Sequence, residues 1–152
     1  MDKDGRSDYE LLERLPTLAE YHALCTAVGW GHVINFDAAS ASLARSVYGV
    51  VVTCAGEAVG MARLVGDGVM YCYVQDVAIH PAHQRRGIGR RIMTTLLRHI
   101  ETQARGPVFV GLFSAAEAEQ LYQQLDFSSQ RDLTGMFRVV VGAGLQQHEA
   151  TE

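Results

Sequence analysis

The stretch "DVAIHPAHQRRGIGRRIM", residues 76–93, determines how the rest of the chain is interpreted. It ends an apolar strand-like run, turns at Pro81 and then carries four arginines within seven positions. Gly87 and Gly89 stand where a helical apolar period begins. First-turn N–H groups lack intrahelical partners, the helix dipole adds positive charge there, and glycine lets an anion approach the main chain. The stretch therefore predicts a phosphate-binding helix N-terminus.

Periodicity on either side of this stretch indicates an α/β chain around a mixed, mostly antiparallel sheet. The apolar positions from Ile88 to Ile100 predict a helix that ends near Gly106 and Pro107. Glycine-containing turns, "AGE" and "GDG", separate three Val- and Tyr-rich runs that are typical of an antiparallel meander. The predicted strands are 48–54, 58–65, 69–79 and, after the helix, the short apolar run 107–113.

The two ends of the chain carry weaker signals. We expect a helix opened by Pro16, a second helix with Asp37 as N-cap, and a helix over 114–125 with Ser114 as N-cap. "DFSSQ" and "GMFRVVVGA" are interpreted as closing strands. The first ten and the last eight residues are polar, and we expect them to be loose.

Composition limits the function classes. A chain of 152 residues with net charge −4 is expected to be a single domain, 1–152, that does not bind nucleic acid. No apolar run suits a membrane span or a signal peptide, so we expect a cytoplasmic protein. The three cysteines show no metal-ligand spacing, so we expect reduced structural thiols and no metal.

Two common phosphate-binding patterns do not fit. A P-loop needs Gly-Lys-Ser/Thr, and the chain's one lysine is Lys3. The dinucleotide fingerprint needs a third glycine where Ile92 stands. On local sequence alone, a solvated basic helix start with glycines for a tight turn is as good an interpretation as a phosphate site.

Two blocks in the expected order resemble the GNAT superfamily of N-acetyltransferases. The first is the apolar-x-Pro strand end at Ile79–Pro81, followed by Gln-x-x-Gly-x-Gly at Gln84–Gly89. The second is "LYQQLDF", residues 121–127, although Asp126 stands where the family usually has glycine. The resemblance covers about residues 16–141. It implies a GNAT-like fold with about four helices, in which strands 69–79 and 107–113 form a splayed parallel pair.

The resemblance also implies that acetyl-coenzyme A is the co-substrate. Its pantetheine arm would pair with main chain at Val77, Ala78 and Ile79, because a splayed strand exposes amide groups. Ser114 would hydrogen-bond the arm. The pyrophosphate would lie on the loop backbone at Gln84, Arg85, Arg86, Gly87, Ile88, Gly89 and Arg90.

Acetyl transfer to an amine needs proton transfer at two places. The resemblance makes Tyr122 the candidate general acid for the thiolate, while packing among Leu121, Leu125 and Phe127 is the alternative. Asp76 is the first choice for a base, and a structural hydrogen bond is its alternative. Strand alternation places Asp76 and Gln75 on opposite faces. Arg63 is interpreted either as a ligand for an acceptor carboxylate or as a surface cross-strand charge.

The expected function is transfer of an acetyl group from acetyl-coenzyme A to a primary amine of a small molecule or protein, by direct attack on the thioester. The alternative from another class is a non-catalytic acyl-coenzyme A sensor. A homodimer paired through the last strands is a further expectation. No motif identifies the amine acceptor.

Overall fold

The computed structural model describes residues 8–143, which belong to two units that divide between Leu112 and Phe113. In the first unit, five strands form one sheet in the order β1-β2-β3-β4-β5. The first four strands are antiparallel neighbours, and β4 and β5 run parallel. The predicted mixed α/β fold with a parallel strand pair is therefore confirmed. The elements are β1 (Tyr9–Leu12), α1 (Leu18–Ala27), α2 (Ala39–Ala44), β2 (Tyr48–Cys54), β3 (Glu57–Gly66), β4 (Tyr71–Ile79), α3 (Ile88–Gln103), β5 (Phe109–Gly111) and α4 (Glu119–Gln123).

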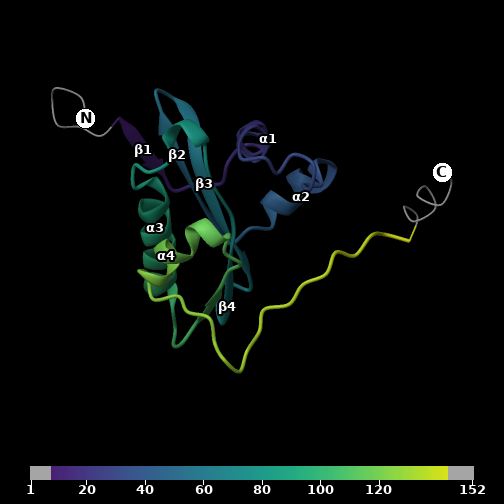
Figure 1. Ribbon diagram of the computed structural model, residues 1–152, viewed down its shortest axis with the longest axis vertical. Coiled ribbons are helices and arrows are strands. Elements are labelled where there is room, and N and C mark those ends of the chain that lie inside the picture. Colours follow the sequence, from purple (N-terminus) through teal and green to yellow (C-terminus); the bar gives the residue numbers. More distant parts are fainter. Residues whose placement is uncertain (1–7, 144–152) are drawn as a thin grey trace. The chain divides into compact units, whose positions relative to one another are not determined.

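Helices cover both faces of this sheet (Figure 1). The long helix α3 packs on β2, β3 and β4, while α1 packs on β3 and β4 from the other side. A Cβ at Gly60 of β3 would lie 3.1–3.2 Å from Ile79, Ile88 and Ile92, so α3 approaches the sheet closely. The core on the α1 side consists of Tyr21, Leu24, Cys25, Ala39, Leu43, Met61 and Ala78. The buried apolar residues of α3 are Ile88, Ile92, Met93, Leu96 and Ile100.

The hairpin turns have the conformations that their glycines predicted. Ala55 and Gly56 both have positive φ, 49° and 82°, as a two-residue hairpin turn requires. In the next turn, Gly66 has φ 127°, and the side-chain carboxylate of Asp67 accepts hydrogen bonds from the three N–H groups of residues 69–71. These bonds hold the pKa of Asp67 below its usual value. The meander is therefore fixed by local sequence.

The prediction that the first ten residues are loose was wrong for Tyr9 and Glu10, which begin the edge strand β1 against β2, while residues 1–7 lie outside the described residues. A four-residue strand gives little periodicity, so its partner rather than its sequence determines it. Helix α1 begins after Thr17, whose hydroxyl accepts from the Glu20 N–H while the Glu20 carboxylate accepts from the Thr17 N–H. Pro16 therefore precedes this cap and does not open the helix.

The second helix also begins differently from the prediction. Asn35, not Asp37, is the capping residue, and its side chain accepts from the N–H of Ala38 at the start of a short 3₁₀ turn over Phe36–Ala38. Helix α2 follows directly at Ala39.

The prediction for residues after the central helix was partly wrong. Strand β5 is limited to Phe109–Gly111. The expected helix 114–125 is divided into a 3₁₀ turn, Ala116–Ala118, and α4. Ser114 does not cap either one, because its hydroxyl donates to the carbonyl of Ala115 at 2.8 Å.

The two expected closing strands, "DFSSQ" and "GMFRVVVGA", are absent from the described part of the second unit. Within residues 113–143, the β-pairing consists of an isolated bridge between Gln130 and Leu133. A strand needs a ladder partner for its main-chain groups, and an apolar alternating pattern does not supply one. The last eight residues lie outside the described residues.

Candidate functional site

The connection from β4 to α3 keeps the order that the sequence predicted. A 3₁₀ turn over Pro81–His83 follows β4, and the imidazole of His80 accepts from the N–H of Ala82 at 3.1 Å. The side chain of Gln84 then donates to the carbonyl of Ile79 at 3.1 Å. This bond joins the loop to the end of β4, so the loop backbone has a fixed path into the helix.

The N-terminus of α3 has the features of an anion-binding site. Gly87, its N-cap, has φ 77°, and Arg85 before it has φ 62°. Glycine has no side chain with which to cap the first-turn N–H groups, and this end has no side-chain cap. A Cβ at Gly87 would meet no protein atom within 4 Å, so the space beside this end is open. A negatively charged group would accept from these donors and interact favourably with the helix dipole.

Two of the clustered arginines also hold the edge strand. Arg86 donates to the Tyr9 hydroxyl at 2.9 Å, and Arg91 donates to the Tyr9 carbonyl at 3.1 Å. The same hydroxyl contacts Nδ1 of His83 at 2.8 Å. Part of the arginine cluster therefore holds β1 in place. The sequence did not reveal this contact, because β1 lies more than 70 positions earlier. A pocket of about 430 Å³ lies beside the N-terminal half of α3. Its lining residues are Leu11, Gly87, Arg90, Arg91, Thr94, Thr95 and Arg98.

Strands β4 and β5 pair over a short distance only. Three pairs, the last of them Tyr73 with Gly111, join the two strands, and β4 continues to Ile79. Beyond Tyr73 the β5-facing edge of β4 is not covered by β5. An extended ligand with amide groups could pair with such an edge as an additional strand. Val77, Ala78 and Ile79, the residues predicted to bind such an arm, lie on this part of β4.

A bulge interrupts β4 at Asp76, which has φ 57°. Met61 pairs with Ala78 and Arg63 pairs with Gln75, so two residues of β4 stand opposite one residue of β3. The bulge breaks the regular alternation of side chains. The prediction that Gln75 and Asp76 lie on opposite faces was therefore wrong, because the two side chains meet in a hydrogen bond.

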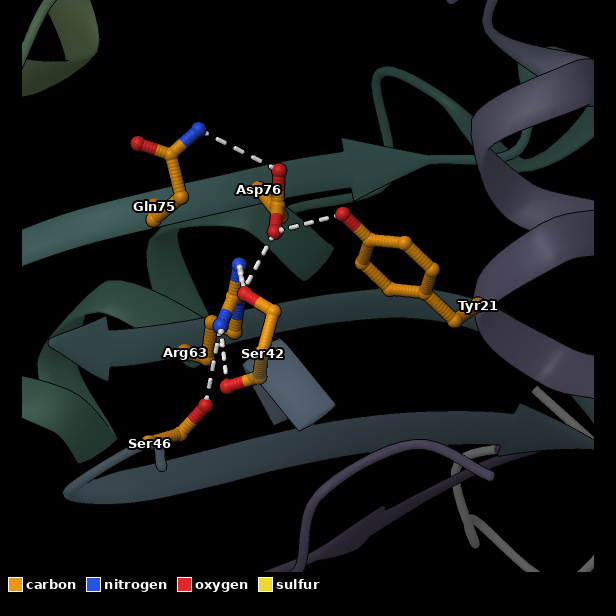
Figure 2. A network of polar contacts seen from close by, with 6 residues as sticks. All are labelled: Tyr21, Ser42, Ser46, Arg63, Gln75 and Asp76. Carbon is orange, nitrogen blue, oxygen red and sulfur yellow. Dashed lines mark hydrogen bonds and ion pairs between the residues drawn. The ribbon is translucent and has the colours of Figure 1, made fainter. Parts of the chain in front are cut away.

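Asp76 is the centre of a buried polar network (Figure 2). Its Oδ2 accepts from Arg63 Nε at 2.7 Å and from the Tyr21 hydroxyl at 3.0 Å. Its Oδ1 accepts from Gln75 Nε2 at 3.2 Å. Asp76 and Arg63 are only 6% and 8% exposed, so this is a buried ion pair supported by further hydrogen bonds. Both oxygens of the candidate base are thus engaged by donors.

The other end of the Arg63 guanidinium binds the segment that follows α1. Nη1 donates to the Ser42 carbonyl at 3.2 Å and to the Ser46 hydroxyl at 3.0 Å, and Nη2 donates to the Ser42 hydroxyl at 3.1 Å (Figure 2). Arg63 therefore ties α2 and the following turn to the bulge in β4. The interpretation of Arg63 as a surface charge was wrong, because its partner and its burial come from elements distant in sequence.

Burial and the network set the protonation of neighbouring groups. Burial first, and then the negative charge of Asp76, raise the pKa of Tyr21. The same two causes raise the pKa of the Cys25 thiol. Tyr21 therefore remains a hydrogen-bond donor at neutral pH. All three cysteines are free thiols, as expected.

The remaining candidate residues lie in the second unit. Tyr122 of α4 is buried, and burial raises the pKa of its hydroxyl. Its ring meets that of Phe127 edge-on at 6.0 Å, and its carbonyl accepts from the Phe127 N–H. Asp126, between them in sequence, has φ 65°, the conformation for which glycine would be the usual residue. Ser114 is exposed, and its hydroxyl bonds the next carbonyl.

Comparison with known proteins supports the motif-based interpretation. Residues 45–129 match the family described as acetyltransferase (GNAT) domain. The segment includes the bulge, the loop with Gly87 and the block around Tyr122.

A curated relative is serotonin N-acetyltransferase 2, chloroplastic, of Oryza sativa subsp. japonica. It is 32% identical over 78 residues, which cover 51% of this chain and 38% of that protein. Two further curated relatives are matched over 35% and 36% of their length. The chain thus spans little more than a third of these relatives.

Solved structures match over a larger share. One is a protein of unknown function from meticillin-resistant Staphylococcus aureus, described as a probable acetyltransferase, with 25% identity and a TM-score of 0.80. The match covers 87% of this chain and 99% of that one. Another is a GNAT family acetyltransferase from Streptococcus pneumoniae, with 27% identity, a TM-score of 0.75 and coverage of 87% and 98%. In residues 8–143, no helix is both long enough and apolar enough to cross a membrane.

Proposed function

Because this chain belongs to the family of GNAT acetyltransferase domains, we propose that it moves an acetyl group from acetyl-coenzyme A to a primary amine of a small molecule or protein. The chemistry would be direct attack of the amine on the thioester. The name of the rice relative specifies an amine acceptor, which favours nitrogen over oxygen as the attacking atom here.

The observation that carries this proposal is the uncapped N-terminus of α3 directly after the uncovered edge of β4. Gly87 provides no side-chain cap at the start of α3, and Val77–Ile79 lie on the part of β4 that β5 does not cover. A ligand that joins a diphosphate to an amide-bearing arm matches both features at once. A simple phosphate compound would use the first feature only.

The residues present fit coenzyme A. We assign the diphosphate to the main chain over Gln84–Arg90, and the arm to Val77, Ala78 and Ile79. Ser114 is assigned a hydrogen bond to the arm. When bound, acetyl-coenzyme A supplies an acetyl group activated as a thioester.

The chain's own groups would then serve the transfer in three ways. The bulge leaves a main-chain group near Val77 without a regular ladder partner, and this N–H is assigned to the developing negative charge on the acetyl oxygen. Tyr122 is assigned to protonate the departing sulfur, since its raised pKa keeps the hydroxyl protonated at neutral pH. Asp76 is assigned to accept the proton that the amine loses, by way of water.

A thiol-release assay with acetyl-coenzyme A and a panel of primary amines tests the proposal. We expect release of free thiol that depends on both enzyme and amine. Absence of amine-dependent release for every amine, with acetyl-coenzyme A binding confirmed by calorimetry, would exclude the transferase.

Tyr122→Phe tests the assigned general acid. We expect kcat to fall roughly 10²-fold or more, the size typical of one general acid, with affinity for acetyl-coenzyme A unchanged. Tyr71→Phe, which removes the hydroxyl of an exposed tyrosine, is the control. Unchanged turnover in Tyr122→Phe would remove that residue from its role.

One observation favours a second candidate, a non-catalytic sensor of acyl-coenzyme A. The carboxylate of Asp76 already accepts from Arg63, Tyr21 and Gln75, which suits a structural group better than a free base. Tight binding of acetyl-coenzyme A without turnover would support this sensor.

A further inference from the structure

We propose that Gln75 binds the attacking amine through its side-chain carbonyl Oε1 and thereby selects primary over secondary amines. This inference rests on the proposed acetyl transfer and specifies its acceptor. It comes from the direction in which the buried network forces the Gln75 amide to point.

The orientation of this amide follows from the chemistry of its partner. Gln75 Nε2 lies 3.2 Å from Asp76 Oδ1. A carboxylate only accepts hydrogen bonds, so the NH₂ end of the amide must face Asp76. The guanidinium of Arg63, 2.7 Å from the other carboxylate oxygen, compensates the negative charge that makes Asp76 an acceptor. Oε1 of Gln75 therefore points away from the network, as Figure 2 shows.

The position of Gln75 suits an amine that meets the thioester. Gln75 stands two residues after Tyr73, the last residue of β4 that pairs with β5. It directly precedes Asp76, which is assigned to accept the amine proton, and lies two residues before Val77, near which the acetyl oxygen is assigned. Gln75 is half-buried, whereas Asp76 is only 6% exposed, so the glutamine is the more accessible of the two.

An acceptor oxygen at this place distinguishes amines by their number of N–H bonds. In the transfer, the amine nitrogen forms a bond to the acetyl carbon, the carbon–sulfur bond breaks, the sulfur gains a proton and the nitrogen loses one. A neutral primary amine has two N–H groups, so one can donate to Oε1 while the other supplies the lost proton. A secondary amine has one, and it would have to serve both purposes.

The test compares a primary amine that the enzyme accepts with its N-methyl derivative. Gln75→Met keeps the length of the side chain and removes the acceptor. We expect kcat/KM for the primary amine to fall roughly five- to tenfold, the size of one hydrogen bond, and that for the N-methyl amine to change little. The preference for the primary amine would shrink accordingly, with acetyl-coenzyme A affinity by calorimetry unchanged.

Gln103→Met is the matched control, because Gln103 is an exposed glutamine at the end of α3. It is expected to keep the wild-type preference. An unchanged preference in Gln75→Met, or an equal loss for both amines, would overturn the inference while acetyl transfer by the wild type stands. Failure of the wild type to release thiol with any amine would instead overturn the proposed function, and this inference with it.

Discussion

Two places, one within β4 and one at the start of α3, carry polar groups that differ in one respect. At Asp76 both carboxylate oxygens are matched by donors from Arg63, Tyr21 and Gln75. After Ile79, the chain leads to Gly87 and a helix N-terminus whose first N–H groups have no side-chain cap from that glycine. The hydrogen bonds at Asp76 hold a bulge with positive φ, whereas the helix start at Gly87 has no side-chain cap and is the place where we propose that a ligand binds. Polar groups whose hydrogen bonds are made within the protein stabilise the fold, whereas donors without a side-chain cap can bind a ligand.

The largest expected effect comes from breaking the network at Asp76. Arg63→Met leaves the buried carboxylate of Asp76 without its countercharge, and the free energy of unfolding should fall by about 3–5 kcal/mol. Urea denaturation measures it. The additional substitution Asp76→Asn removes the unpaired charge and should restore part of the lost stability. A decrease of less than about 1 kcal/mol in Arg63→Met alone would contradict a buried ion pair of this kind.

Tyr21→Phe removes one donor and keeps the ion pair. We expect a loss of about 2 kcal/mol, the contribution of a hydrogen bond to a charged group. Because the pKa of Tyr21 is raised in the folded protein, its contribution is present below the ordinary tyrosine pKa, about 10, and is lost as pH rises through the folded value. The stability difference between the two proteins, followed by denaturation at several pH values, should therefore shrink at strongly alkaline pH. A difference that stays constant there would contradict the assigned bond.

Gly87→Ala tests the helix start. The positive φ makes alanine cost about 1 kcal/mol, and the added Cβ stands beside the assigned diphosphate site. Gly56→Ala is a matched control, since Gly56 has a similar φ of 82° and equally open surroundings in a hairpin turn. We expect similar thermal shifts in both variants and weaker acetyl-coenzyme A binding in Gly87→Ala alone. Equal affinities would place the diphosphate elsewhere.

The smallest effect concerns an ion pair outside both places. The hydrogen bond from Arg14 is the main reason why the pKa of Glu20 lies below its usual value. Its stabilisation is therefore present above the unfolded pKa of about 4.3 and is lost as pH falls through the lower folded value. Glu20→Gln keeps the capping oxygen, so the free energy of unfolding should fall by only about 0.5 kcal/mol at neutral pH. In urea denaturation at several acid pH values, the variant should lose less stability than the wild type as the pH falls. A loss as large as that of Arg63→Met would show that burial is not what separates the two pairs.

The motif, the central helix and the meander could be predicted because each depends on short-range rules. The start of α3 at Ile88, the turn at Ala55 and Gly56, and the positive φ tolerated at Asp126 all follow from neighbouring residues. The network could not be predicted, since Tyr21 and Arg63 reach Asp76 from two different elements, and Ser42 binds Arg63 from a third. The signals in the sequence were Arg63, a charged residue within an otherwise apolar strand, and Asp76, for which a structural hydrogen bond was one interpretation.

The sequence by itself determined the family, the order of the central elements and the glycine-bearing helix start, because these depend on local conformation and apolar periodicity. Tertiary structure alone decided that Asp76 lies in a bulge, that Arg63 is buried beside it, and that Tyr9 takes up two of the clustered arginines. The physical reason is that hydrogen bonds and ion pairs between distant residues depend on how the strands and helices pack, and no local pattern records that.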